Sequence, residues 1–343
     1  MTTIPQQSLR AAIAAVLPAA GSTGIMACAL VVRGPDSITL TASDYDVTLQ
    51  TTMPAPPGDV WTLCVNARAF NDVVAAMPPG DVVIEAVDAS MTLSAGRSRF
   101  TLRGLGAEEF PGVAIGDAEG APVELNIDGI KRVSHAVSAD ESRPALNGIC
   151  MGADGSMTAT DGHRVAHAPG DGSNGVAAIL HRRAVDIVSR MDAPTIAAAG
   201  RHMLITSGPT TLTVRAVEEK FPDWRKVVPE HKPTLTANNA ALVSALRRVG
   251  VLGSGKHALV RVKIADGRMT LDATHPELGD AHAEVECDVV GADVEIGMNP
   301  RYMLDALAAV GGETVTLALG DQFAPMLVTG GDGVLCVCMP MRL

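Results

Sequence analysis

The sequence predicts an α+β protein of three repeated domains, each with two helices packed on antiparallel sheets. Three expected helices share an Arg two residues after their first residue, at Asn66 and Arg68, His181 and Arg183, and Asn299 and Arg301. Their starts lie 115 and 118 residues apart, and Phe-Pro runs at 110–111 and 221–222 close the first two repeats. Such a long period indicates a duplicated domain rather than a short solenoid repeat. We therefore expect domains at 1–120, 121–232 and 233–343.

The first repeat begins with a helix at 8–17, which has apolar residues at helical spacing and ends at Pro18. Strands are expected at 26–32, 37–42, 47–53 and 61–65. Asn66 is the predicted N-cap of a helix that continues to residue 77. Three further strands follow at 82–87, 91–95 and 99–102, and Gly and Pro at 116–122 indicate a linker.

The second and third repeats follow the same order. The second has helices at 127–137 and 181–191 and strands at 149–151, 156–160, 164–167, 203–206 and 211–216. In its middle, Asp161-Gly162 between two β-type runs predicts a tight hairpin turn. The third has helices at 239–249 and from Asn299, its predicted N-cap, onward, with strands at 259–264, 269–273, 282–287, 314–319 and 334–339.

Composition limits the class of protein. The 343 residues are 47% hydrophobic, 19% charged and only 3% aromatic, so the cores must be aliphatic. The six cysteines form no C-x-x-C pair and are expected to be reduced and buried in a cytoplasmic protein. We expect no secretion signal, and the apolar runs at 11–20 and 24–32 are too short to span a membrane.

Charge is distributed unevenly along the chain. The net charge is −11, which by itself argues against nucleic acid as a partner. The six expected helices, however, carry ten basic and four acidic residues, a net +6, so the remainder carries −17. A positive helical surface on an acidic body suits a protein that holds a polyanion on one face. Ordinary solvated helix faces are the simpler explanation of the same count.

Five motifs in order carry a resemblance to a known family. They are GRSRF at 96–100, SRPALNG at 142–148, ATDGHR at 159–164, FPDWRKVVP at 221–229 and MPMRL at 339–343. Together they resemble the bacterial DNA polymerase III beta subunit, the replicative sliding clamp, over the whole chain. Lys226, Val165 and Trp224 stand where Arg, Leu and Tyr are common in that family.

The resemblance implies the DNA clamp fold and a head-to-tail homodimeric ring, with helices lining the hole and sheets outside. A clamp of this kind does no covalent chemistry. It encircles double-stranded DNA through phosphate contacts and tethers the DNA polymerase III alpha subunit and other proteins with a clamp-binding motif. A clamp loader opens and places it. No cofactor, metal or membrane is implied.

The resemblance also implies a pocket for partner peptides, in which Met and Leu side chains would form an adaptable apolar groove. Its residues are Leu146, Thr160, Gly162, His163, Arg164, Val165, Pro222, Lys226, Val227, Val337, Met339, Pro340, Met341, Arg342 and Leu343.

Two further sets of residues are expected to bind DNA and the second subunit. Arg182 and Arg183 match the family best as DNA contacts, and the other helix cations follow: Arg10, Arg68, Lys131, Arg132, Arg247 and Arg248. At the dimer interface, an edge with Arg97, Arg99, Phe100 and Leu102 should meet the other subunit's Val251, Leu252, Glu277 and Glu284.

Other functions were weighed against the clamp. Residues 250–256 match most of a P-loop, but His257 replaces the magnesium-binding Ser or Thr. His163 and His167 have the spacing of a zinc helix, yet their segment reads as a strand without the Glu of H-E-x-x-H. Asp161, His163 and a Ser could indicate a hydrolase, but no G-x-S-x-G motif is present. The alternatives are a clamp paralogue, from a phage or a second locus, or an enzyme acting on DNA or nucleotides.

Overall fold

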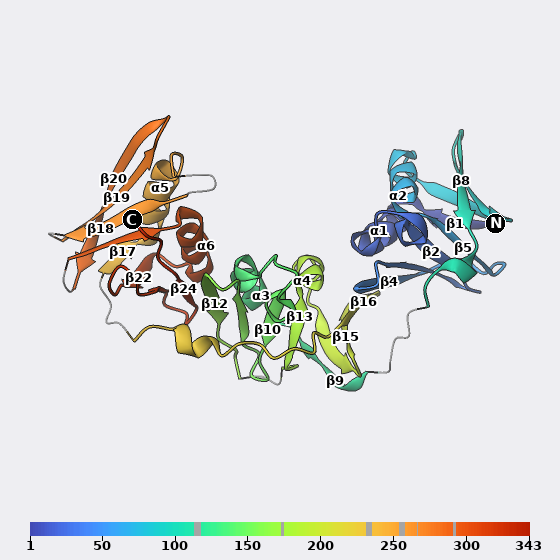
Figure 1. Cartoon of the computed structure of the whole chain (residues 1–343). Coiled ribbons are helices and arrows are strands. Elements are labelled where there is room, and N and C mark those ends of the chain that lie inside the picture. The colour runs from blue at the N-terminus through green and yellow to red at the C-terminus, as the bar shows by residue number, and fades with distance from the viewer. Residues whose placement is uncertain (113–117, 173–174, 231–234, 254–257, 266, 291–292) are drawn as a thin grey trace. The chain divides into compact units, whose positions relative to one another are not determined.

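The computed structural model (Figure 1) describes residues 1–112, 118–172, 175–230, 235–253, 258–265, 267–290 and 293–343. These residues form two compact units. The first comprises Met1–Leu125 and Asp186–Ala216, and the second comprises Asn126–Val185 and Val217–Leu343. Each unit contains one large antiparallel sheet with helices packed against it, so the predicted α+β class is confirmed.

The sheet of the first unit has the order β1-β6-β7-β8-β5-β2-β3-β4-β16-β15-β14-β9. Its strands are β1 (Thr2–Pro5), β2 (Cys28–Arg33), β3 (Ser37–Ser43), β4 (Val47–Pro54), β5 (Trp61–Asn66), β6 (Asp81–Val87), β7 (Ser90–Ala95), β8 (Ser98–Leu105), β9 (Glu119–Glu124), β14 (Thr195–Ala199), β15 (His202–Ser207) and β16 (Thr210–Arg215). Helices α1 (Gln6–Val16) and α2 (Ala67–Ala76) pack on each other, and α1 also packs on β3 and β4.

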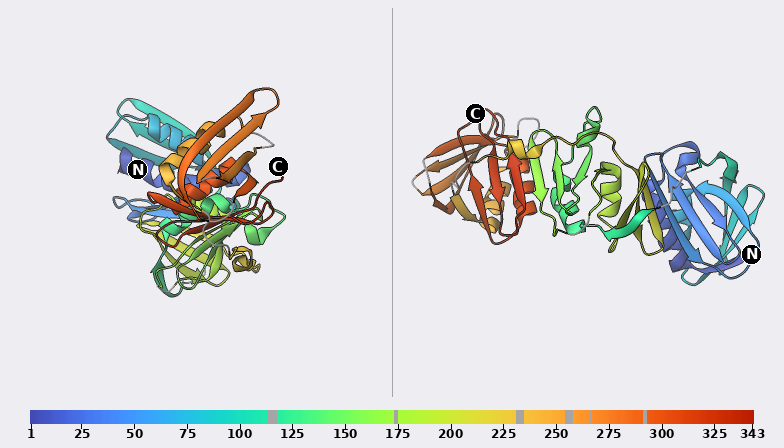
Figure 2. Two further views of the ribbon diagram at one scale, coloured as in Figure 1. Left: turned by 90° about the vertical axis from the view of Figure 1, so that its left-hand side faces the viewer. Right: turned by 90° about the horizontal axis from the view of Figure 1, so that it is seen from below.

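The sheet of the second unit has the order β13-β10-β11-β12-β24-β23-β22-β17-β20-β19-β18-β21. Its strands are β10 (Gly148–Met151), β11 (Met157–Thr160), β12 (Arg164–Ala168), β13 (Ala178–His181), β17 (Leu235–Asn238), β18 (Val260–Ala265), β19 (Arg268–His275), β20 (Gly279–Val289), β21 (Val294–Met298), β22 (Thr314–Ala318), β23 (Met326–Thr329) and β24 (Leu335–Cys338). The long hairpin of β19 and β20, drawn in orange, is visible from two directions (Figures 1 and 2).

Helices α3 (Ile127–Val133), α5 (Asn239–Val249) and α6 (Pro300–Val310) cover the second sheet, and α6 contacts both α3 and α5. In α4 (Arg182–Val188) the chain passes from the second unit to the first. Short 3-10 turns occur at Leu17–Ala19, Gly24–Ala27, Ala107–Glu109, Ser134–Ala136, Pro144–Leu146 and Trp224–Val227. Among the helices described, none is long and apolar enough to cross a membrane.

Four helices begin with an asparagine N-cap, whose side-chain oxygen accepts a hydrogen bond from a backbone N–H in the first turn. Asn66 accepts from Ala69 at 2.9 Å, and Asn299 accepts from Arg301 at 2.9 Å, as the sequence predicted. Asn126 and Asn238 cap α3 and α5 in the same way. These bonds satisfy N–H groups that the helix itself leaves unpaired, and they fix where each helix starts.

The cores are aliphatic, as the composition predicts, with Leu9, Ile13 and Leu40 fully buried in the first unit and Leu246 and Leu271 in the second. All six cysteines are free thiols, and four of them are buried. Burial raises the pKa of Cys338 to about 12, and the charges of Arg164 and Asp161 modify it further, so this thiol stays protonated at neutral pH.

Three sequence predictions need correction. Residues 119–122 of the expected linker belong to β9, which pairs with β14, and Pro122 lies where the register shifts, so it need not donate to the ladder. His181 ends β13 opposite Gly148 instead of starting a helix. The short strands β1, β13, β14, β17, β21 and β23 were not predicted. The three domain boundaries stay a prediction.

Candidate functional site: an apolar pocket beside the central hairpin

The hairpin between β11 and β12 is fixed by its own side chains. The Asp161 carboxylate accepts hydrogen bonds from the backbone N–H groups of His163 and Arg164, at 2.9 and 3.1 Å. The Thr160 hydroxyl donates to the Arg164 carbonyl at 2.7 Å. Gly162 has φ +90, a conformation that favours glycine. The turn therefore presents His163 and Arg164 in defined positions, as the Asp-Gly pair predicted.

Arg164 connects this hairpin to α6 and to the turn after α3. Its guanidinium binds Asp161 at 2.9 Å and Asp305 at 2.6 Å, and it also donates to the His135 carbonyl. The Tyr302 ring lies 4.3 Å from the guanidinium carbon. Burial and the nearby Arg164 charge lower the pKa of His135. Arg164, with a side chain only 10% exposed, is thus held by two carboxylates and an aromatic ring.

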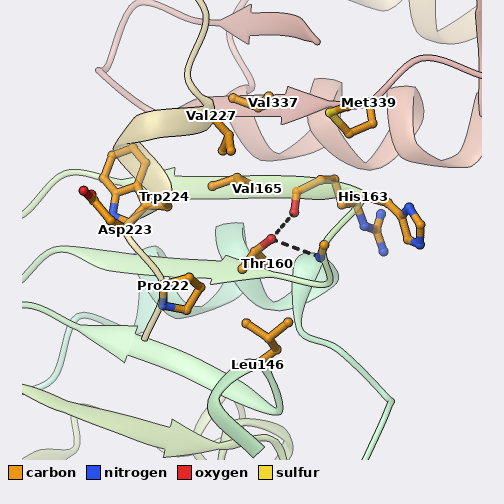
Figure 3. Close-up of a pocket in the computed structure, with 12 residues that line it drawn as sticks. Leu146, Thr160, His163, Val165, Pro222, Asp223, Trp224, Val227, Val337 and Met339 are labelled. Carbon is orange, nitrogen blue, oxygen red and sulfur yellow. Dashed lines mark hydrogen bonds between the residues drawn. The ribbon is translucent and has the colours of Figure 1, made fainter. Parts of the chain in front are cut away.

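A pocket of about 270 Å³ lies next to the hairpin (Figure 3). It is lined by Leu146, Thr160, Gly162, His163, Arg164, Val165, Pro222, Asp223, Trp224, Val227, Val337 and Met339. Val165 of β12 and Val337 of β24 are direct cross-strand neighbours and form its floor. Aliphatic side chains dominate the wall, so the pocket suits an apolar side chain of a ligand.

Ten of the fifteen residues expected at a partner pocket line this one. Lys226 is exposed and pairs with Asp223 at 3.5 Å, outside the lining. The C-terminal residues after Met339 also lie outside it, because the Met341 N–H donates to the Gly297 carbonyl at 2.8 Å next to β21. The strand pairing of β24 ends at Cys338, two residues before Pro340, close to the position predicted.

Asp223 and Trp224 line the pocket but were not among the predicted pocket residues. The Trp224 ring stacks on His167, with 4.3 Å between ring centroids and 26° between planes. A signal was present in the sequence, because Trp224 lies between Pro222 and Val227, which were both expected at the pocket.

The eight expected DNA contacts differ in how far other groups already hold them. Arg132 is bound to Asp128 at 2.8 Å, to Asp332 and to the Ala309 carbonyl. Arg182 donates to the Ala139 carbonyl at 3.4 Å, and Arg248 donates to the Ser244 hydroxyl at 2.8 Å. Arg183 also has a partner. The remaining four cations are exposed, and none of them forms an ion pair with an acidic side chain among the described residues: Arg10, Arg68, Lys131 and Arg247.

Two strands, β8 and β20, each have one edge that is unpaired along most of its length within the described residues. Residues 98–103 of β8 pair with β7, whereas β5 reaches only Gly104 and Leu105. Residues 279–286 of β20 pair with β19, whereas β17 reaches only 287–289. Arg97, Arg99, Phe100 and Leu102 of the expected interface lie at the first edge, and Glu284 lies at the second. Glu277 lies in the turn before β20, and Val251 and Leu252 follow α5, with Val251 69% exposed.

The residues considered for catalysis do not assemble into a site in the described part of the chain. His163 lies in the hairpin turn, and the His167 ring is bound to the Thr158 hydroxyl at 2.9 Å. Residues 254–257 of the P-loop-like run lie outside the described residues. No group of three potential metal ligands gathers among the residues that the structure describes.

Comparisons with known proteins agree with the geometry. The profile of the DNA polymerase III beta subunit N-terminal domain matches residues 9–114, and that of its C-terminal domain matches residues 225–342. The Pseudomonas aeruginosa beta sliding clamp is 32% identical over 345 residues, covering 92% of this chain and 91% of that one. The Pseudomonas putida beta sliding clamp is 31% identical over 340 residues, with the same coverage.

A solved structure of the Pseudomonas aeruginosa DNA polymerase sliding clamp superposes with a TM-score of 0.92 at 27% identity, covering all of both chains. Both relatives exceed 30% identity over about nine tenths of their length, and the fold agrees along the full length. The chain therefore belongs to the DNA polymerase III beta subunit family of sliding clamps, the non-catalytic processivity factors of bacterial DNA replication.

Proposed function

We propose that this chain forms a head-to-tail homodimeric ring that encircles duplex DNA and tethers partner proteins through the apolar pocket beside the hairpin. The observation that carries the proposal is the pocket itself. It is enclosed by residues from four separate stretches of the chain, and most of its lining is apolar. A non-catalytic processivity factor acts only by binding, so it needs a site of this kind to hold its polymerase.

The grip on DNA would come from exposed helix cations. Arg10, Arg68, Lys131 and Arg247 are the strongest candidates, since no acid competes for them among the described residues. Three further cations would have to give up the contacts that they already make before they could bind DNA: Arg182, Arg183 and Arg248. Arg132 is the weakest candidate because two carboxylates already neutralise it. Such contacts reach phosphates only, so binding is independent of sequence and falls as salt rises.

Ring closure would pair the open side of β8 in one subunit with the open side of β20 in the other. The β8 edge carries Arg97, Arg99 and Arg103, and the β20 edge carries Glu284 and Glu286. Opposite charges on edges of two different faces favour a head-to-tail contact, and they oppose pairing of either edge with its own copy.

Replacing Phe100 with Asp puts a negative charge on the basic edge and should turn the dimer into monomers in sedimentation. The matched control is Thr92→Asp on β7, whose two sides are both paired. A Phe100→Asp protein that stays dimeric at micromolar concentration would contradict this interface.

The repeat predicts domains at 1–120, 121–232 and 233–343. The two matched profiles, at 9–114 and 225–342, cover most of the first and the third of these domains and so support them. We infer that the partners are the DNA polymerase III alpha subunit, a clamp loader and other proteins with a clamp-binding peptide, and that the protein acts in the cytoplasm, where bacterial DNA is replicated. Identification of co-purifying proteins distinguishes a replicase clamp from a specialised paralogue.

Topology provides the test of encirclement. Free protein should bind DNA weakly, with an affinity that falls as salt rises. Protein loaded by a clamp loader on a nicked circular plasmid should stay bound at salt that abolishes the free contact. Cutting the plasmid at one site should then release it. Equal retention on circular and linear DNA would refute the ring.

A further inference from the structure

One wall of the pocket contains an aromatic stack that joins it to the sheet. The stretch at 221–228 crosses the second unit's sheet as a loop with a 3-10 turn, Trp224–Val227. Its described backbone hydrogen bonds are local, from the Lys226 N–H to the Asp223 carbonyl and from the Val228 N–H to the Arg225 carbonyl. Its position on the sheet therefore depends on side chains, and Trp224 makes the ring stack on His167 of β12.

The His167 ring is itself held by a residue of the neighbouring strand β11. His167 pairs across the ladder with Thr158 of β11, and a hydrogen bond of 2.9 Å joins its Nδ1 to the Thr158 hydroxyl. Thr158 is buried and His167 is half-buried, so the bond holds the imidazole against the sheet. The imidazole is thus a preformed platform, and the orientation of the indole follows from it. The Arg225 guanidinium lies 4.8 Å from the Trp224 ring and stabilises the same indole.

Trp224 closes one end of the pocket. Figure 3 shows it at the end opposite His163 and Met339, with Pro222 and Val227 between. Leu146, Val165 and Val337 supply aliphatic wall elsewhere. A ligand side chain that reaches the Trp224 end therefore meets an indole, whereas one at the other end meets His163 and Met339.

We propose that Trp224 is a specificity-determining residue of this pocket, positioned by His167, and that it selects partner peptides with an aromatic rather than an aliphatic anchor at its end. The inference rests on the proposed function of the pocket as a peptide site. Aromatic pairs gain energy beyond the area they bury, which corresponds to roughly two- to tenfold in affinity. The preference for an aromatic anchor should be of that size.

The test uses fluorescent peptides with two apolar anchors, in matched pairs that have Phe or Leu at one anchor, exchanged at each position in turn. Titration into the wild-type dimer should show a two- to tenfold preference for Phe at one position only. Trp224→Leu keeps an apolar wall and should remove this preference while changing the affinity for the Leu peptide by less than about twofold. His167→Ala should remove it as well, because the platform is lost.

The rescue variant is His167→Phe, which restores a ring under Trp224 without the hydrogen bond to Thr158, and the Phe preference should return. Val227→Ala is the control, since it enlarges the pocket without touching the stack. It should weaken both peptides alike. Circular dichroism and sedimentation check that every variant is a folded dimer.

The possible failures are distinguishable. If the wild type binds the Phe and Leu peptides equally, or if Trp224→Leu keeps the preference, the role of Trp224 is refuted while the pocket stands. If the folded wild-type dimer binds none of the peptides, the proposed function of the pocket is refuted, and this inference with it.

Discussion

Replacing Arg164 with methionine should destabilise the second unit more than any change of a surface ion pair. In the wild type the Arg164 guanidinium binds two carboxylates, Asp161 at 2.9 Å and Asp305 at 2.6 Å, and donates to the His135 carbonyl. Its side chain is 10% exposed, and those of Asp161 and Asp305 are 16% and 29% exposed. Methionine keeps part of the apolar stem but leaves two carboxylates and a carbonyl without their donor.

The expected loss follows from these exposures. Breaking a fully buried ion pair by removing one partner costs about 3–5 kcal/mol. Here water can reach Asp305 and partly replace the lost donor, which moves the value to the lower end of that range. We therefore expect Arg164→Met to lower the free energy of unfolding by about 3 kcal/mol. The control is Arg143→Met, whose pair with Asp140 is about half exposed and should change stability by about 0–1 kcal/mol.

Urea unfolding measures the difference. The chain has two tryptophans, so a Trp61→Phe background leaves Trp224 as the only tryptophan, which is excited at a wavelength where the two tyrosines do not absorb. It lies in the same unit as Arg164. A double-mutant cycle with Asp305→Asn should give a coupling energy above about 1 kcal/mol. The reasoning is wrong if Arg164→Met and Arg143→Met have the same effect, or if the coupling is zero.

Three further predictions concern stability and binding. Burial lowers the pKa of His135 and of His167, so the unfolded state binds more protons than the folded state, and stability should be lost as pH falls below 6.5. The urea midpoint should therefore change less between pH 7.5 and 5.5 when both histidines are replaced by Gln than in the wild type. An equal change in both proteins would refute this. Deleting residues 339–343 removes Met339, the one residue of this segment that lines the pocket, and should leave a folded dimer that binds fluorescent clamp-binding peptides at least about 2 kcal/mol more weakly. Unchanged affinity would show that Met339 contributes nothing to binding. Arg33→Met should cost about 2–4 kcal/mol in urea unfolding, because Arg33 is fully buried and binds Thr2 and three backbone carbonyls; a neutral effect would contradict this.

Local chemistry explains what the sequence could predict. Asn66 and Asn299 were correctly placed as N-caps, because a cap bonds to N–H groups only two or three residues away. The Asp161-Gly162 turn was predictable for the same reason, since its hydrogen bonds stay within four residues. The ten expected residues that line the pocket were named from family motifs, because nothing local relates Leu146 to Val337.

The missed elements depend on distant partners. Strands β13, β14 and β23 have four or five residues each, and their pairing with β10, β15 and β22 decides their conformation. The edge strand β9 contains Gly120 and Pro122 and has no apolar alternation, so only its pairing with β14 reveals it. Trp224 was missed although it lies between Pro222 and Val227, because its stack on His167, 57 positions earlier in the chain, cannot be read from the local sequence.

Two strand pairs, here called seams, join residues 121–232 to strands outside that range, and they limit how this segment can be exchanged. β16 pairs with β4 from Thr210 opposite Thr51 to Val214 opposite Val47, and β12 pairs with β24 from Arg164 opposite Cys338 to His167 opposite Leu335. A fragment cut at 121–232 would lose both β4 and β24 and would present β16 and β12 as two bare edges, which are templates for aggregation. The middle repeat therefore needs both neighbours to complete its sheets. A chimaera that exchanges residues 121–232 between clamps must therefore carry matching strands for both seams with it.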